Sequence, residues 1–208
     1  MQLNKTKTKI QPFNCSRKFD FLPELNVDGQ NLEVVYSTNI LGVIFSSSLK
    51  WDEHVDELVK KARQKVWFIQ RLKRVGASQK NLVEMYKLFV RQSLEFAAPL
   101  WANALTQNNK HKIERIQAQV TDLILGPNQL SYSERLRELD LSDLEERRLK
   151  LSKKFCSKMI KDDCFKFLYP QRRTKTRSKR KYIEPQCKTN RMKLSAIPSF
   201  IQMLNNEQ

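Results

Sequence analysis

The 208 residues are enough for one domain with a sizeable core or for two small ones, so the chain belongs to no class that needs disulfides to fold. Lysine and arginine number 39 against 22 aspartates and glutamates, which gives a formal net charge of +17. An excess of this size predicts a polyanionic partner, most often nucleic acid. Charge alone indicates the class of partner and leaves the mechanism open.

Several kinds of site are disfavoured by the sequence. It has no apolar run of about 18 residues, so we expect no membrane span and no secretory signal. The histidines and cysteines lack the spacing of metal ligands, which argues against zinc. They are His54, His111, Cys15, Cys156, Cys164 and Cys187. We expect an intracellular protein, in the nucleus or the cytoplasm, with reduced thiols. The oligomeric state stays open.

Residues 1–50 have the pattern of short strands. Residues 9–13 form an extended run, and Asp28–Gly29 lies between alternating apolar segments, which is typical of a β-hairpin. A further β-rich stretch, I-L-G-V-I-F, covers residues 40–45. Because so few strands bury little surface by themselves, we expect them to need a partner surface.

From Trp51 onward the apolar period changes to that of helices. A first helix is predicted to run to Gly76, with apolar side chains from Val55 to Val75 facing inward. A second begins after Ser78, a favourable N-cap. Its inward residues are expected to be Leu82, Met85, Tyr86, Phe89, Val90, Leu94 and Phe96. Further helices are predicted at 113–125, at 133–139 and from Leu144 to Phe167, which together make a helical bundle.

Past Pro170 the composition changes again. The segment R-R-T-K-T-R-S-K-R-K at 172–181 holds seven basic residues in ten, which is typical of a solvated linker that contacts phosphates without reading bases. A small helix is expected after Pro198. The prediction is therefore an α+β fold that is mainly α, in three parts: short strands and a hairpin (1–50), a helical bundle (51–168), and a basic, partly disordered tail with a short C-terminal helix (169–208).

Five stretches match family signatures in order along nearly the whole chain. They are L-G-V…L-x-W-x-x-H at 41–54, Y-K-x-x-V-R-x-x-L-E-F-A-x-x-x-W at 86–101, I-E-R-x-Q at 113–117, Y-x-x-R-L…R-R at 132–148, and S-A-I-P at 195–198. Together they resemble the thumb side of reverse transcriptases from Jockey-like non-LTR (LINE-type) retrotransposons. Lys50 and Gln92 depart from the pattern, where a hydroxyl residue and a proline are usual.

The resemblance implies an RNA-directed DNA polymerase whose catalytic part is missing from these residues. Template-directed polymerisation needs paired aspartates that hold two Mg²⁺ ions, and neither the early palm aspartate nor the aromatic-Ala-Asp-Asp motif occurs in the sequence. Asp162–Asp163 lies in a helical pattern and is expected to be an exposed pair. Lys7, in an L-N-x-x-K-T motif, matches a lysine that follows the catalytic aspartates and is vestigial here. We expect no catalytic residue, no metal and no cofactor, and so no enzyme on its own.

The same resemblance implies that the helices grip a primer–template duplex. The candidate phosphate-binding residues are Lys60, Lys61, Arg63, Lys65, Arg71, Lys73 and Arg74 of the first helix, and Arg172, Arg173, Lys175, Arg177, Lys179, Arg180 and Lys181 of the basic segment. An ordinary solvated helix face remains the alternative for each. Trp51 and Trp101 are expected in the core, whereas Trp67 lies off the apolar stripe and could stack on a base.

Two functional hypotheses follow. The first is a fragment of a retrotransposon reverse transcriptase that binds RNA or DNA weakly, mainly through phosphates, with strong salt dependence. The second is a domesticated helical protein that has been kept for binding nucleic acid or another protein.

Overall fold

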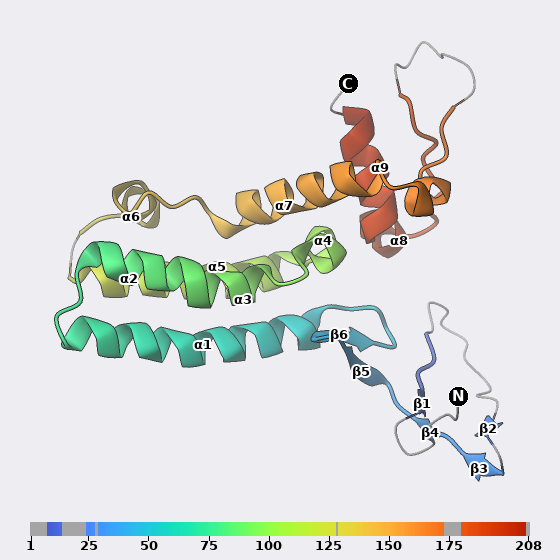
Figure 1. Ribbon diagram of the computed structural model, residues 1–208, viewed down its shortest axis with the longest axis horizontal. Coiled ribbons are helices and arrows are strands. Elements are labelled where there is room, and N and C mark those ends of the chain that lie inside the picture. The colour runs from blue at the N-terminus through green and yellow to red at the C-terminus, as the bar shows by residue number, and fades with distance from the viewer. Residues whose placement is uncertain (1–7, 14–23, 28, 128, 173–179, 207–208) are drawn as a thin grey trace. The chain divides into compact units, whose positions relative to one another are not determined.

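The computed structural model describes residues 8–13, 24–27, 29–127, 129–172 and 180–206 (Figure 1). The chain divides into two compact units, residues 1–57 and 58–208, and helix α1 (Asp52–Arg74) runs through the division. Most of the described residues are helical and the strands are short. The predicted α+β class, mainly α, is confirmed.

The first unit contains three pairs of short strands. β1 (Lys9–Ile10) pairs in parallel with β4 (Glu33–Val34), and β2 (Asn26–Val27) pairs antiparallel with β3 (Gln30–Asn31). Val27 lies opposite Gln30, so the hairpin predicted at residues 28–29 is confirmed, with Gly29 at φ +79°. Asp28 itself lies outside the described residues.

A second hairpin was not predicted. The stretch 40–45 is broken between β5 (Ser37–Ile40) and β6 (Val43–Ser46), which pair antiparallel across a two-residue turn. Both turn residues have positive φ, +50° at Leu41 and +89° at Gly42, the combination that a tight hairpin requires. Glycine adopts this conformation freely, whereas leucine there costs about 1 kcal/mol. Leu41 is 92% exposed at the tip.

The strands find their partner surface at the start of α1. Ser37 Oγ donates to Glu53 Oε2 at 2.6 Å, and the Ile44 amide donates to His54 Nδ1 at 3.3 Å. Trp51 packs edge-on against Phe45, with ring centroids 5.7 Å apart. His54 is 1% exposed and therefore serves packing. The hairpin β5–β6 and the first turns of α1 thus share one small core.

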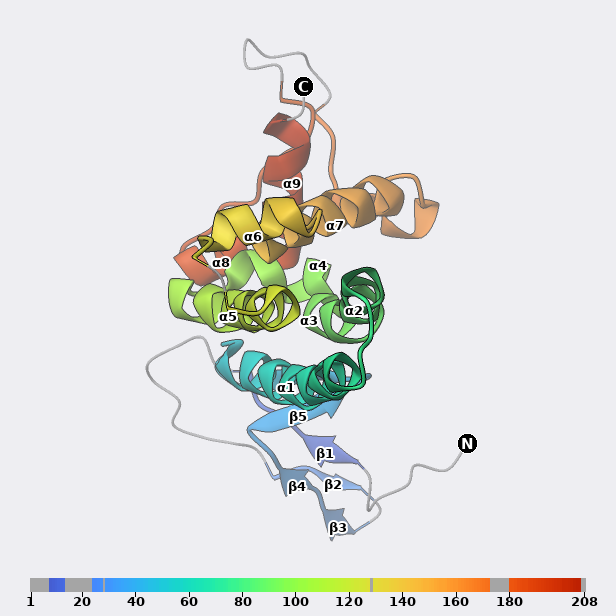
Figure 2. The ribbon, with the colours of Figure 1, turned by 90° about the vertical axis from the view of Figure 1, so that its left-hand side faces the viewer.

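The second unit is a layered helical bundle. Figures 1 and 2 show three successive layers: the part of α1 from Leu58 on, a middle layer of α2, α3 and α5, and a third layer of α6 and α7. The elements after α1 are α2 (Gln79–Met85), the π-helix η1 (Tyr86–Arg91), α3 (Gln92–Glu95), α4 (Ala98–Trp101), η2 (Ala102–Ala104), α5 (Gln107–Leu125), α6 (Tyr132–Glu138), α7 (Leu144–Met159), η3 (Asp163–Leu168), α8 (Asn190–Leu194) and α9 (Ala196–Asn206). Side chains mark several of the starts, because a hydroxyl or carboxylate accepts a backbone N–H of the first turn. Ser78, as predicted, Thr106, Ser131 and Asp143 do so.

The second predicted helix is interrupted, and two of its expected core residues are wrong. Residues 86–91 form a π-helical turn, in which each turn holds more residues than in an α-helix. The wider turn shifts the residues that face inward, so Tyr86, Val90 and Leu94 are buried while Phe89 and Phe96 are 46% and 50% exposed. α3 ends before Phe96, which leaves the helical conformation, and Ala97, at φ +52°, precedes α4. Trp101 is fully buried, as predicted.

The ends of other helices also differ from the prediction. Val75, expected to face inward, is 80% exposed because α1 ends at Arg74. α7 ends at Met159 and not near Phe167, since the Asp162 carboxylate accepts the Cys164 amide at 3.0 Å and starts the 3₁₀ helix η3. α9 begins at Ala196, before Pro198, which a first turn tolerates because the proline nitrogen needs no partner there.

The two ends of the basic segment lie side by side. Gln171 and Tyr182 form an antiparallel bridge, and the Arg172 amide donates to the Lys181 carbonyl at 2.9 Å. The side chain of Asn205, in α9, pairs with the backbone of Tyr182 as a neighbouring strand would. It accepts the Tyr182 amide at 3.0 Å and donates to the Tyr182 carbonyl at 3.1 Å. The cluster beneath consists of Cys156, Tyr169, Tyr182, Phe200 and Ile201. Residues 169–172 and 180–206 therefore pack with α7 in the helical unit.

Replacing Asn205 should loosen this stem. Asn205→Ala leaves the buried amide and carbonyl of Tyr182 without their side-chain partner, which costs about 1–3 kcal/mol of unfolding free energy. The measurement is urea denaturation followed by circular dichroism. Asn206→Ala, at the exposed neighbouring position, is the matched control and should change little. Equal effects of the two substitutions would contradict the role of Asn205.

Candidate nucleic-acid interface

Basic side chains form a stripe on the solvent side of α1. Five residues at helical spacing, which fall within a sector of about 80° of the helix, are exposed. They are Lys60, Arg63, Trp67, Arg71 and Arg74, and we call them the α1 stripe. The opposite side holds buried Leu58, Ala62 and Ile69. The amphipathic pattern of the sequence therefore directs the charges outward because the apolar side is taken up by the core.

An aromatic side chain lies within the stripe. Trp67 is 56% exposed, and the Arg71 guanidinium lies over its ring, 4.6 Å from the centroid. Such a cation–π pair contributes about 0.5–1 kcal/mol at an exposed site and holds the guanidinium flat. The pair offers both a positive charge and a planar surface, the combination that nucleic-acid backbones and bases recognise.

Two of the predicted phosphate-binding lysines have structural roles in the helical unit. Lys65 Nζ donates to Ser93 Oγ. Lys73 Nζ donates to the Leu123 carbonyl at 2.6 Å, near the C-terminal end of α5, where carbonyls lack helical partners and the helix dipole favours a cation. Lys61 is also exposed, and around the axis of α1 it lies between the α1 stripe and Lys65. Of the seven basic residues predicted on α1, the four in the α1 stripe thus form a single exposed row.

The second predicted cluster is described only at its two ends. Arg172, Arg180 and Lys181 are exposed at the stem of the segment. Arg180 pairs with Glu184 at 3.3 Å, and Lys181 Nζ lies 5.6 Å from the centroid of the Tyr182 ring. Arg173, Lys175, Arg177 and Lys179, like Lys7, lie outside the described residues. The antiparallel stem holds the two flanks of these four charges together.

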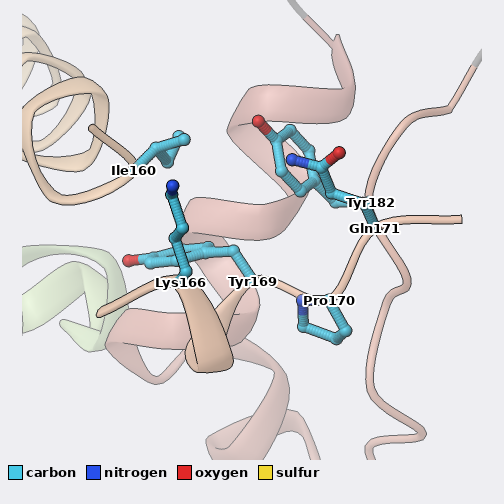
Figure 3. A pocket seen from close by; sticks show the side chains of 6 residues that line it. All are labelled: Ile160, Lys166, Tyr169, Pro170, Gln171 and Tyr182. Atoms are coloured by element: carbon cyan, nitrogen blue, oxygen red, sulfur yellow. The ribbon is translucent and has the colours of Figure 1, made fainter. Parts of the chain in front are cut away.

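A small pocket lies beside this stem (Figure 3). Tyr169 and Tyr182 line it with Pro170, and Lys166 reaches it while paired with Asp163. Burial raises the pKa of Tyr169 to about 12, so its hydroxyl stays neutral. The volume is about 260 Å³, below the roughly 300–1,000 Å³ of typical ligand sites. We therefore regard this pocket as a packing gap between η3 and the stem.

A buried polar network joins three helical elements and the loop before α7. Tyr86 of η1 donates to Gln117 Oε1 of α5, and Gln117 Nε2 donates to Tyr132 of α6 at 2.9 Å and to the Ser142 carbonyl at 3.1 Å. Gln117 is fully buried, so each of its bonds replaces one that water would otherwise make. Burial and the neighbouring acids raise the pKa of Tyr86 and of Tyr132 well above the usual range, which keeps both as donors.

Glu114 extends the network to the start of α7. It accepts the Tyr132 hydroxyl and also the Leu144 amide, at 3.2 Å to each carboxylate oxygen. The second contact satisfies an N–H that α7 itself cannot pair. Burial raises the pKa of Glu114, although these hydrogen bonds and nearby Arg148 act in the opposite direction. Arg148 is 2% exposed, and burial lowers its pKa.

An ion pair connects α7 with α3. Arg147 Nε lies 2.5 Å from Glu95 Oε1, and Nη2 lies 3.0 Å from Oε2, so the guanidinium binds the carboxylate with two parallel contacts. This contact raises the pKa of Arg147. Residues of three separate sequence motifs therefore lie close together: Tyr86 and Glu95, Glu114 and Gln117, and Tyr132 with Arg147 and Arg148.

One basic row was missed at the level of the sequence. Lys154, Lys158 and Lys161 are exposed along α7 and just past its end. Their spacing of four and three residues places them on one side of a helix, and this was the signal that could have revealed them.

Other kinds of site have less support. In the described part of the chain, no group of three or more His, Cys, Asp or Glu side chains could hold a metal ion. Within the same residues, none of the helices combines the length and the apolar character that crossing a bilayer requires. Comparisons of the chain with protein-family models, curated proteins and solved structures found no match. Charge and geometry are therefore the observations that bear on function.

Removing one hydroxyl should reveal the cost of the network. Tyr86→Phe leaves the buried Gln117 Oε1 without its donor, and we expect a loss of about 1–3 kcal/mol in unfolding free energy. Tyr36→Phe is the control, since Tyr36 is 64% exposed. Urea denaturation of both variants is the measurement. If Tyr86→Phe loses no more unfolding free energy than Tyr36→Phe, the network does not stabilise the bundle.

The raised pKa of Glu114 predicts a pH dependence. Because the folded-state pKa lies above the unfolded one, the contribution of Glu114 is fully present below about pH 4.3 and is lost as the pH rises through the folded pKa. Unfolding free energy of the wild type relative to Glu114→Gln should therefore fall with rising pH. Denaturation at a series of pH values tests this, with exposed Glu138→Gln as control. A constant or rising difference would be inconsistent with it.

Proposed function

We propose that this chain binds nucleic acid through its phosphates, and that it is a thumb-like region of a non-LTR retrotransposon reverse transcriptase without polymerase carboxylates among its residues. The α1 stripe carries the proposal. Between Lys60 and Arg74 it extends about 21 Å, or roughly six base pairs of a duplex, with four cations along this length. A solvated helix face has no need for such a row, apart from the last turn, where cations complement the helix dipole.

The expected binding is weak and tolerant of sequence. Lysine and arginine at phosphates fix position but carry no base information. The Trp67–Arg71 pair adds a stacking surface that every base can use. The four charges of residues 173–179, which lie in the sequence between the paired residues Arg172 and Lys181, supply further phosphate contacts. Affinity should therefore depend steeply on salt.

The origin from a reverse transcriptase has support of a different kind. The signature residues Tyr86, Gln117 and Glu114 are hydrogen-bonded to one another in the buried network, and the signature residues Glu95 and Arg147 form an ion pair between α3 and α7. Residues that were matched from distant stretches of the sequence therefore have direct partners among one another in the fold. A domesticated interaction protein would keep the same core, so the network supports the family and leaves its present use to experiment.

The salt dependence of binding tests the stripe. Arg63→Gln/Arg71→Gln/Arg74→Gln removes three charges and should reduce the slope of log affinity against log salt by about 2 for a single-stranded oligonucleotide, at roughly 0.7 per lost contact. The matched control, Lys80→Gln/Arg115→Gln/Arg137→Gln, removes three exposed charges from α2, α5 and α6. Fluorescence anisotropy is the measurement. Equal reductions in both variants would mean that net charge, and not the stripe, binds the oligonucleotide.

The same assay examines the basic segment. Replacing residues 173–179 by an uncharged Gly/Ser sequence of equal length removes four charges and keeps the Arg172–Lys181 pairing. An unchanged slope would exclude this segment as a phosphate contact.

Primer extension tests the absence of polymerase activity. The purified chain with a primed RNA template, deoxynucleotides and Mg²⁺ should give no product, because two-metal catalysis requires paired carboxylates that the sequence does not supply in the expected hairpin. A product that is lost when Asp162 and Asp163 are replaced by asparagine would overturn this expectation. An active reverse transcriptase in the same buffer is the positive control.

A further inference from the structure

A groove of about 670 Å³ lies between the α3–α4 region and α7, apart from the α1 stripe. Pro99, Leu151 and Phe155 give it an apolar lining. Lys154, Lys158 and Lys161 line it as well and are exposed. Phe155 is 44% exposed although its ring also packs against Phe200, 6.1 Å between centroids. Apolar surface bordered by cations in this way is a feature of recognition sites rather than of an ordinary solvated surface.

The charge of the groove has one sign. Glu95 is the single acid among its lining residues, and Arg147 holds it with two contacts while only 11% of its side chain is exposed. Its charge is therefore already compensated. The three lysines are left to set the potential of the groove, which favours a negatively charged occupant.

We infer that this groove binds an acidic amphipathic helix of a partner protein. From Leu151 to Lys161 it follows about 15 Å of chain, which matches two to three turns of a docked helix. The apolar side of such a helix would lie on Leu151 and Phe155, and its acidic flank would meet the lysines. Nucleic acid fits less well, since phosphates gain nothing from proline and leucine side chains and would lose hydration against them.

The test uses the full chain and a phage-displayed library of short helical peptides. Enriched peptides should carry apolar residues at i, i+3 or i+4, and i+7 together with a net negative charge. Their affinities are then measured by anisotropy against two variants. Ser157→Trp fills the groove from an exposed lining position, and Lys154→Glu/Lys158→Glu reverses its charge. Each should weaken binding about tenfold or more.

Matched controls separate the groove from general effects. Ser157→Ala keeps the groove open, and Arg115→Glu/Arg137→Glu makes the same charge change on α5 and α6; both should bind within about twofold of the wild type. Thermal unfolding confirms that each variant is folded. Enrichment of neutral or basic peptides, no enrichment, or equal binding to Ser157→Trp would overturn the inference.

A nucleic-acid occupant is a distinct outcome. If oligothymidylate displaces the peptides, and if Ser157→Trp lowers its affinity as much as theirs, the groove is a nucleic-acid site and the inference fails. The proposed phosphate binding by the α1 stripe is judged separately by its own salt slope, so either can fail without the other.

Discussion

The helical unit depends on the hydrogen bonds of one fully buried carboxamide. Gln117 has an acceptor and two donor positions, and its partners come from η1, from α6 and from the loop before α7. An apolar residue of similar size would fill the same space but would accept helices in several rotations and registers. Because a buried amide tolerates few arrangements, Gln117 selects one of them. Glu114, one turn earlier on α5, adds the α7 start to the same set.

Charge in this bundle is divided between cohesion and the surface. Four basic side chains interact with groups inside the helical unit, although basic residues in such excess predict a polyanionic partner. They are Lys65, Lys73, Arg147 and Arg148. What remains outside is arranged in separate rows: the α1 stripe, the stem of the basic segment, and the lysines of α7. Different rows can serve different partners, since an exposed tryptophan lies within the α1 stripe and the apolar groove lies beside the lysines of α7.

The sequence predicts elements better than it predicts how they are joined. Ser78 caps the start of α2 as predicted, because an N-cap depends on neighbouring residues alone. Gly76, with φ +85°, follows α1 just past its last helical residue, so the prediction placed this end to within two residues. The π-helical turn, the early end of α7 and the paired stem depend on distant contacts that periodicity cannot show. Of the candidate site, the α1 charges were found from helical spacing. That Lys73 would turn to the Leu123 carbonyl, fifty positions away, could not be predicted from that spacing.

The π-helical turn at Tyr86–Arg91 also bears on the length of the chain there. It holds about one residue more than an α-helix would over the same span, and the wider turn takes up that extra residue. A single deletion between Lys87 and Phe89 would therefore restore the α form while Leu94 keeps facing the core and Glu95 keeps facing Arg147. The same deletion within a regular α-helix would instead rotate everything after it by about 100°. Sequences that share this bundle can therefore differ by one residue in length at this turn and keep the same core.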